Sequence, residues 1–177
     1  IIEAQAVKMF ATGRYATLQH WADQLGGHVS DTPYLNLMLA LINTDSGRWD
    51  VVEERLKLAE RKFTETANAI GCLKVQMHRG FVFYRHGNFE KGLELSADAI
   101  QKAATLGLDE VLGIANLYAG LCLFRLARLP EAEQHLQQAV EILERQQKKY
   151  DLAIALNNLS LVLNAQGRSS EAERAQQ

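Results

Sequence analysis

The sequence predicts an all-α fold, a right-handed superhelical solenoid of about five antiparallel helix-turn-helix repeats. The main observation is a short turn that recurs as Gly13-Arg14-Tyr15, Gly47-Arg48-Trp49, Gly87-Asn88-Phe89, Ala127-Arg128-Leu129 and Gly167-Arg168-Ser169. Successive turns start 34, 40, 40 and 40 residues apart, and a fixed period of about 20 to 50 residues is typical of solenoids. Apolar residues follow a helical period between the turns. The 2 prolines, Pro33 and Pro130, both lie near expected helix starts, where proline is tolerated.

Each turn separates two predicted helices, and a longer polar link joins one pair to the next. The first helix of each pair is predicted over 2–12, 33–46, 68–86, 109–126 and 150–166. The second is predicted over 15–26, 49–64, 89–106, 129–148 and 169–177. The links are expected at 26–32, 64–66, 107–109 and 148–150.

Local signals support these elements in chain order. Asp31 or Thr32 before Pro33 is a plausible N-cap with proline at the first helical position. Gly107 is a plausible C-cap, because glycine accepts the left-handed conformation that ends helices. Two second helices show a single apolar face, made of Val52, Leu56, Ala59 and Phe63 in one and of Ala132, Leu136, Ala139, Val140 and Leu143 in the other.

Small residues recur where the two helices of a pair should touch. They are Ala6, Ala40, Gly80, Gly120 and Ser160 in the first helices, followed by Met9, Asn43, Phe83, Leu123 and Leu163. The second helices place Leu18, Val52, Gly92, Ala132 and Ala172 opposite them. This pattern resembles the tetratricopeptide repeat, most closely in repeats three to five. The 40-residue period exceeds the roughly 34 residues of the common form, so longer helices are expected.

A second resemblance is more specific. Gly13-Arg14-Tyr15-Ala16-Thr17-Leu18, Trp21, Leu25, Pro33-Tyr34-Leu35, Ser46-Gly47-Arg48-Trp49, Asn157-Asn158-Leu159-Ser160 and Gln166-Gly167-Arg168 resemble the helical-repeat region of MalT-type regulators. Gly26 departs from this pattern, since the family often has proline there. MalT-type proteins are ATP-dependent bacterial transcription activators of the LuxR class, with a superhelical sensor domain between an NTPase module and a helix-turn-helix module. The resemblance implies that ATP would be bound by a separate module and that this chain holds no cofactor.

Composition bounds the class of protein. The 177 residues are expected to form one repeat domain, with repeats at about 1–32, 33–67, 68–108, 109–149 and 150–177. A formal net charge of −2 argues against direct contact with nucleic acid. Without a membrane-spanning run or signal segment, a cytoplasmic location is expected, with Cys72 and Cys122 as buried free thiols. The chain starts without methionine and stops inside a predicted helix, which suggests a piece of a larger protein.

The sequence carries no motif for catalysis, metal binding or cofactor binding. It has no glycine-rich phosphate loop, no HExxH and no Cys-x-x-Cys. Its 5 histidines lie at no ligand spacing. We therefore expect a protein that is not an enzyme.

The predicted binding surface is the concave face lined by the first helices. Its residues are those not needed against the second helices, and solenoids bind partners along such faces. In the third to fifth repeats they are Lys74, Met77, His78, Phe81, Tyr84, Arg85, Tyr118, Leu121, Phe124, Arg125, Asn157 and Asn164. Tyr84-Arg85 and Phe124-Arg125 are equivalent pairs, 40 residues apart, that suit a planar ligand, a carboxylate or a peptide.

The same residues also fit a structural interpretation. Aromatic residues at helical spacing often form the core between adjacent repeats, and arginine near a helix C-terminus favours the helix dipole. Arg14, Arg48, Arg128 and Arg168, inside the turns, are interpreted as structural.

The leading functional hypothesis is a non-enzymatic sensor domain of a MalT-like bacterial transcription regulator. It would bind a small-molecule inducer, a peptide or a regulatory protein, without contacting a membrane, and could form a homo-oligomer. The alternative is a tetratricopeptide scaffold that binds a peptide or protein and has no link to transcription.

Overall fold

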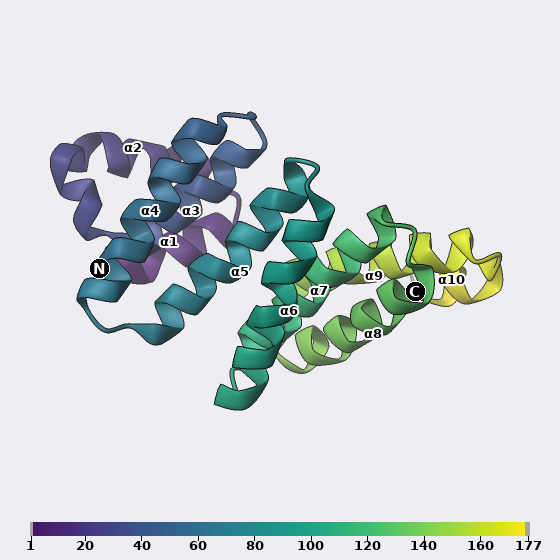
Figure 1. The fold of residues 1–177 in the computed structure, drawn as a ribbon. Helices are drawn as coiled ribbons and strands as arrows, with labels where there is room; N and C mark the ends of the chain where they lie inside the picture. The colour runs from purple at the N-terminus through teal and green to yellow at the C-terminus, as the bar shows by residue number, and fades with distance from the viewer. Residues whose placement is uncertain (1, 176–177) are drawn as a thin grey trace. The chain divides into compact units, whose positions relative to one another are not determined.

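The computed structural model describes residues 2–175, and these residues are all-α (Figure 1). Two compact units divide the chain, Ile1–His78 and Arg79–Gln177, and the division falls inside one helix. We describe each unit by itself. The expectation of a single repeat domain remains a prediction.

The helices form consecutive antiparallel pairs, as the sequence predicts. The first unit holds α1 (Ile2–Ala11), α2 (Tyr15–Leu25), the 3-10 helix η1 (Gly26–Asp31), α3 (Pro33–Thr44), α4 (Trp49–Glu65) and the start of α5 (Ala69–Arg85). The second holds the rest of α5, α6 (Phe89–Leu106), α7 (Asp109–Arg125), α8 (Leu129–Arg145), α9 (Lys149–Ala165) and α10 (Ser169–Ala175). The predicted helix ends at 46 and 148 are wrong, because α3 stops at Thr44 and α8 at Arg145. Residues 176–177 of the last predicted helix lie outside the described residues.

A three-residue turn closes most helices by the same two hydrogen bonds. At the end of α4, the Asn68 N–H donates to the Phe63 carbonyl at 2.8 Å and the Ala67 N–H donates to the Thr64 carbonyl at 3.0 Å. This is the Schellman motif, whose middle residue takes a left-handed conformation. Equivalent bonds close the turns at Gly87, Gly107, Ala127, Gln147 and Gly167.

These turns correct the prediction of longer links between repeats. Left-handed residues stand at Gly47, Ala67, Gly87, Gly107, Ala127, Gln147 and Gly167, one every 20 residues. The links at 64–66, 107–109 and 148–150 are therefore parts of turns as tight as the predicted ones. Gly107 is the left-handed C-cap that the sequence predicts, with φ 65° and ψ 31°. The 40-residue period consists of two equal steps.

The residue that ends each turn also begins the next helix. Asn68 accepts the Gly71 N–H at 2.8 Å, and Asn88 accepts the Lys91 N–H at 3.1 Å, both through the side-chain oxygen. At the equivalent positions, Arg128 and Arg168 pair instead with glutamates in the first turn of α8 and α10. These contacts support the structural interpretation of the two arginines.

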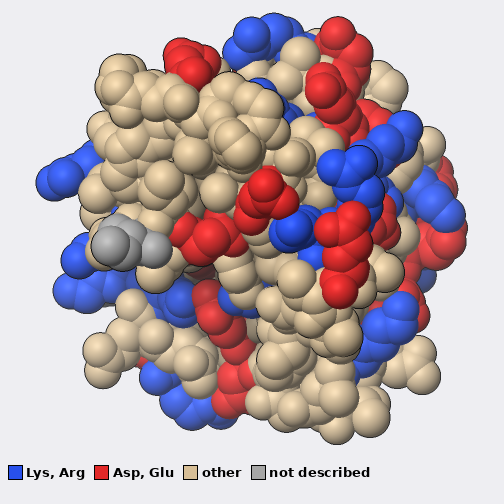
Figure 2. Space-filling model, turned by 90° about the vertical axis from the view of Figure 1, so that its left-hand side faces the viewer, with Lys and Arg blue, Asp and Glu red and all other residues tan. Residues whose placement is uncertain are grey.

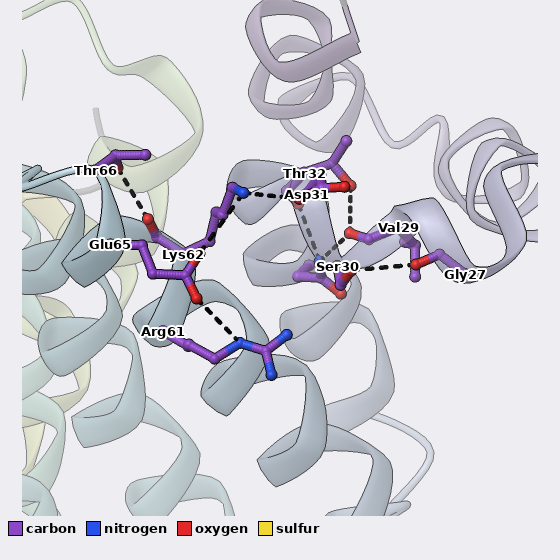
Figure 3. Close-up of polar contacts among 10 residues, drawn as sticks. Gly27, Val29, Ser30, Asp31, Thr32, Arg61, Lys62, Glu65 and Thr66 are labelled. Atoms are coloured by element: carbon purple, nitrogen blue, oxygen red, sulfur yellow. Dashed lines mark hydrogen bonds and ion pairs between the residues drawn. The ribbon is translucent and has the colours of Figure 1, made fainter.

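The link between α2 and α3 differs from all later links. Residues 26–31 form η1 rather than the expected loop. The predicted N-cap Thr32 does not cap α3, because its hydroxyl donates to the Val29 carbonyl at 2.7 Å (Figure 3). Asp31 accepts the Lys62 ammonium at 2.7 Å and so ties η1 to α4 (Figure 3).

The start of α3 is capped by a residue of α1. The Glu3 carboxylate accepts the backbone N–H groups of Tyr34 at 3.0 Å and Leu35 at 3.3 Å. Desolvation by burial raises the pKa of Glu3, and these two hydrogen bonds oppose that rise. The cap joins the first helix pair to the second.

Close approach of small residues explains the predicted contact positions. A Cβ added to Gly80 would lie 3.2 Å from the Gly92 carbonyl oxygen, and one added to Gly120 would lie 2.6 Å from Leu136 Cγ. The helices touch there because no side chain separates them. Cys122 lies fully buried against Gly92, and burial raises the pKa of its thiol to about 12. Cys72 is only half-buried.

Two helix pairs share a buried asparagine clasp. Asn36 in α3 accepts from the Arg55 guanidinium at 3.0 Å, and Asn116 in α7 contacts His135 Nδ1 at 2.8 Å. Each partner lies 19 residues after its asparagine. Desolvation lowers the pKa of His135. A neutral histidine thus occupies the position where the second repeat has an arginine.

The turn after α3 lacks the long bond of the Schellman motif. Asn43 stands where the other turns have apolar residues such as Phe63 or Leu123, and Ser46 Oγ donates to the Asn43 carbonyl at 3.0 Å. The Asn43 side chain is 3 % exposed, and among the described residues nothing donates to its amide oxygen. A buried polar atom without a partner destabilises the fold.

Left-handed strain predicts opposite effects of two substitutions. Ala127→Gly should stabilise the protein by roughly 0.5 kcal/mol, since φ 59° strains an alanine. Gly87→Ala, at φ 86° with open space around the new Cβ, should destabilise it by about 1 kcal/mol. Urea unfolding measures both. Gly27→Ala, where φ is not left-handed, is the control and should change little. Equal effects at 87 and 27 would contradict the strain.

The orphaned amide predicts that Asn43→Leu stabilises the protein by about 1 kcal/mol. Asn36→Leu is the matched control, because Asn36 is also buried but its amide hydrogen bonds are made. That control should destabilise by a similar or larger amount. Thermal unfolding of the two variants measures the difference, and destabilisation by Asn43→Leu would show that its side chain has a structural role.

Candidate binding surface

The structure places the predicted surface residues in both compact units. Lys74, Met77 and His78 belong to the first unit. The Lys74 ammonium lies 5.8 Å from the centre of the Tyr34 ring, His78 is half-buried, and Met77 is buried. The other predicted residues, from Phe81 onward, belong to the second unit, where they can be considered together.

Tyr118 and Leu121 are buried rather than presented on a surface. They are 9 % and 5 % exposed, and burial raises the pKa of the Tyr118 phenol well above its usual range. The cause is that α7 is apolar around its whole circumference and is packed by α6, α8 and α9. These two residues, with Met77, therefore serve packing and leave the predicted surface to the others.

Aromatic rings in the second unit form one connected cluster. The Phe81 ring stacks on Tyr118 at 4.8 Å between ring centres and on Tyr84 at 6.0 Å. Tyr84 in turn contacts Phe89 at 5.9 Å. The Phe81–Tyr118 contact joins α5 to α7, so part of the cluster is the inter-repeat core that the structural interpretation predicts.

The sequence analysis missed Phe89, the first residue of α6. Its signal is the aromatic residue that follows the turns, as Tyr15 does in the first repeat. Phe10 and Tyr15 contact at 5.5 Å across their turn, as Tyr84 and Phe89 do across theirs. The recurrence indicates that Tyr84 helps to fix the turn.

Two arginines cover the edge of this cluster. The Arg125 guanidinium lies 4.9 Å above the Phe89 ring, and that of Arg85 lies 5.8 Å from the Phe81 ring centre. Both arginines are exposed. The sequence predicts two parallel Tyr-Arg and Phe-Arg pairs, but the structure pairs Arg125 with Phe89 instead of its neighbour Phe124, which is half-buried. We call Phe81, Tyr84, Arg85, Phe89 and Arg125 the cation–aromatic cluster.

The geometry of Arg125 suits binding of a planar anion. A guanidinium that stacks on a ring keeps its N–H groups in the plane, directed away from the ring face. Among the described residues, no acceptor lies within hydrogen-bond distance of those groups. The ring also restricts the side chain before a ligand arrives, which lowers the entropy lost on binding.

Asp151 lies beside this region, in the first turn of α9. Desolvation raises its pKa, nearby Glu110 adds to the rise, and Lys148 opposes it. Lys148 itself pairs with Glu110 at 2.6 Å. The described residues offer the Asp151 carboxylate no hydrogen bond, so it is a half-buried charge that the fold does not compensate.

The remaining predicted residues, Asn157 and Asn164, lie exposed on α9. They contact neither the cation–aromatic cluster nor each other among the interactions of the described residues. The structure therefore separates the predicted surface into the cluster and the exposed face of α9.

Charge is mixed rather than concentrated. On the face shown in Figure 2, basic and acidic side chains alternate, with no large area of one sign. No group of three or more metal-ligating side chains is found among residues 2–175. None of the described helices is long and apolar enough to cross a membrane.

Comparison with known proteins supports the repeat architecture. Residues 110–177 match the family model described as tetratricopeptide repeat. The crystal structure of BtubC (BKLC) from P. vanneervenii superposes with a TM-score of 0.69 and 18 % sequence identity, covering 99 % of this chain and 72 % of that one. At that identity the likeness shows the fold alone. No curated protein matches the chain.

The uncompensated carboxylate predicts that Asp151→Asn stabilises the protein at neutral pH. Because the folded-state pKa lies above 3.8, folding becomes less favourable as pH rises from about 4 through the raised pKa. The stability difference between variant and wild type should therefore vanish near pH 3. Urea unfolding from pH 3 to pH 7 measures it. Asp109→Asn is the control, because Asp109 is paired with Arg145 at 2.9 Å and removes the same charge. A gain at Asp109 equal to that at Asp151 would contradict the explanation.

Proposed function

We propose that the chain is a non-enzymatic binding domain that holds a peptide or protein segment on the cation–aromatic cluster of its second unit. Tetratricopeptide repeats generally mediate protein–protein interaction, and the matching residues 110–177 include Arg125. The observation that carries the proposal is the Arg125 guanidinium held over Phe89 with no acceptor among the described residues.

Peptide recognition suits this geometry better than catalysis does. Exposed guanidinium groups beside aromatic rings offer bidentate hydrogen bonds and a stacking surface. The groups with raised pKa in this region, Tyr118 and Asp151, have no nucleophile or metal-ligand set near them among the described residues. The chemistry is therefore recognition of an anionic, planar or aromatic group.

Within this proposal, the chain is the sensor domain of a MalT-type transcription regulator. The support is the resemblance of its turns and of Asn157-Asn158-Leu159-Ser160 to that family. The effector would be a small-molecule inducer or a regulatory protein, and the ATP site and the DNA-binding module would lie elsewhere in the protein. Binding can then control those modules only if it distinguishes two conformations.

The alternative within the same proposal is a scaffold with no link to transcription. The family match of residues 110–177 supports either version. Extending the reading frame separates them. A nucleotide-binding module upstream and a helix-turn-helix downstream would establish the regulator, and their absence from the whole gene product would establish the scaffold.

The proposal predicts that Arg125→Ala weakens peptide binding by about 10-fold or more, which is about 1.4 kcal/mol. The probe is a peptide selected by phage display on the wild-type chain, with its affinity measured by fluorescence anisotropy. Arg125→Lys should recover only part of the loss, because lysine lacks the planar fork. Arg85→Ala should add a further loss.

The control is Arg145→Ala, which removes an exposed arginine paired with Asp109 outside the cluster. It should leave the affinity unchanged. Selected peptides that bind equally well to all four variants would overturn the proposed surface, and turnover of a substrate by the isolated chain would overturn the non-enzymatic function.

A further inference from the structure

One exposed helix face in the second unit carries no charge. The fully exposed positions along α9 after its first residue include Tyr150, Ala153, Asn157, Leu161 and Asn164, spaced by 3 or 4 residues. This is the spacing of a single helix face. We call these five residues the α9 stripe. Tyr150 and Leu161 are 60 % and 44 % exposed.

The repeat itself shows what such a stripe does when it is covered. Positions 40 residues earlier on α7 correspond to Gly113, Leu117 and Leu121, and all three are buried. Leu121 is 5 % exposed, whereas its equivalent Leu161 is 44 % exposed. The backbone and helix length are the same, at 17 residues for each helix. The stripe therefore has the form of a packing surface without a neighbour among the described residues.

Charge distinguishes the stripe from the exposed face of α8. That face carries Glu131, Glu141, Glu144 and Arg145, so two copies laid against each other there would bring like charges together. The stripe avoids this conflict. Its two asparagines each carry a donor and an acceptor, so they can satisfy their own copies across a two-fold axis.

We propose that the α9 stripe is the interface of a symmetric homodimer, in which a second copy of the chain packs its own stripe against it. In such an isologous contact the same patch lies on both sides. Leu161 and Asn157, at the middle of the stripe, lie near the two-fold axis and face their equivalents. The cation–aromatic cluster lies on α5, α6 and α7 and is separate from this contact.

The first test is the molar mass of the chain in solution, measured by light scattering and sedimentation across about two decades of micromolar concentration. The wild type should be a dimer that dissociates on dilution. Leu161→Asp should raise the dissociation constant by at least about 10-fold, since it places two carboxylates at the axis. Leu106→Asp is the control, because Leu106 is exposed on α6, outside the stripe. It should leave the dimer intact.

The second test identifies the face independently of affinity. Asn157→Cys should form a disulfide-linked dimer under mild oxidation, whereas Gln138→Cys on the exposed face of α8 and the wild type should not. Circular dichroism checks that each variant remains helical. A wild type that is monomeric at the highest concentration overturns the proposal. So does a dimer that survives Leu161→Asp and gives no Asn157→Cys crosslink, because it must use another face.

Discussion

From α4 onward, every helix end that the structure describes depends on one pair of hydrogen bonds around a left-handed residue. The longer bond joins residues five apart, such as Asn68 to Phe63, and brings the chain back within three residues. Because the acceptor's own side chain is usually apolar, the turn and the core are anchored at the same residue. The 17-residue length of α4, α5, α7, α8 and α9 follows from repeating this closure every 20 residues. Asn43 shows the reverse case, in which a polar acceptor residue accompanies a turn that lacks the longer bond.

Much of the fold could be predicted because its signals are local. Gly87 and Gly167 mark turns by conformational freedom, and Gly80 with Gly92 marks a close approach of two helices. The turns at Ala67 and Gln147 were missed as turns because neither residue is glycine, although both take positive φ. The η1 helix was missed because hydrogen bonds such as that of Thr32 to Val29 leave no pattern of apolar residues.

The candidate surface was harder to predict because exposure depends on neighbours. Tyr118 and Leu117 carry the same helical spacing as Asn158 and Asn157, yet α7 is enclosed and α9 is open along that face. Periodicity identifies a face but does not say what covers it. The pairing of Arg125 with Phe89 also escaped the sequence, since it joins residues from different helix pairs. What the sequence did identify correctly was the recurrence of arginine at the end of the first helices.

The double use of one residue at each turn has a consequence for how such a chain can change in length. Asn88 ends the turn after α5 and caps α6, so no linker residue lies between the two elements. A single inserted or deleted residue within α6 or α7 would shift every later contact by about 100° of helix rotation. Tolerated changes there must come as whole helices. Residues 26–32, which bend through η1 and are held to α4 by Lys62, contain the slack that the later turns lack. Natural variation in length among relatives should therefore collect in that segment.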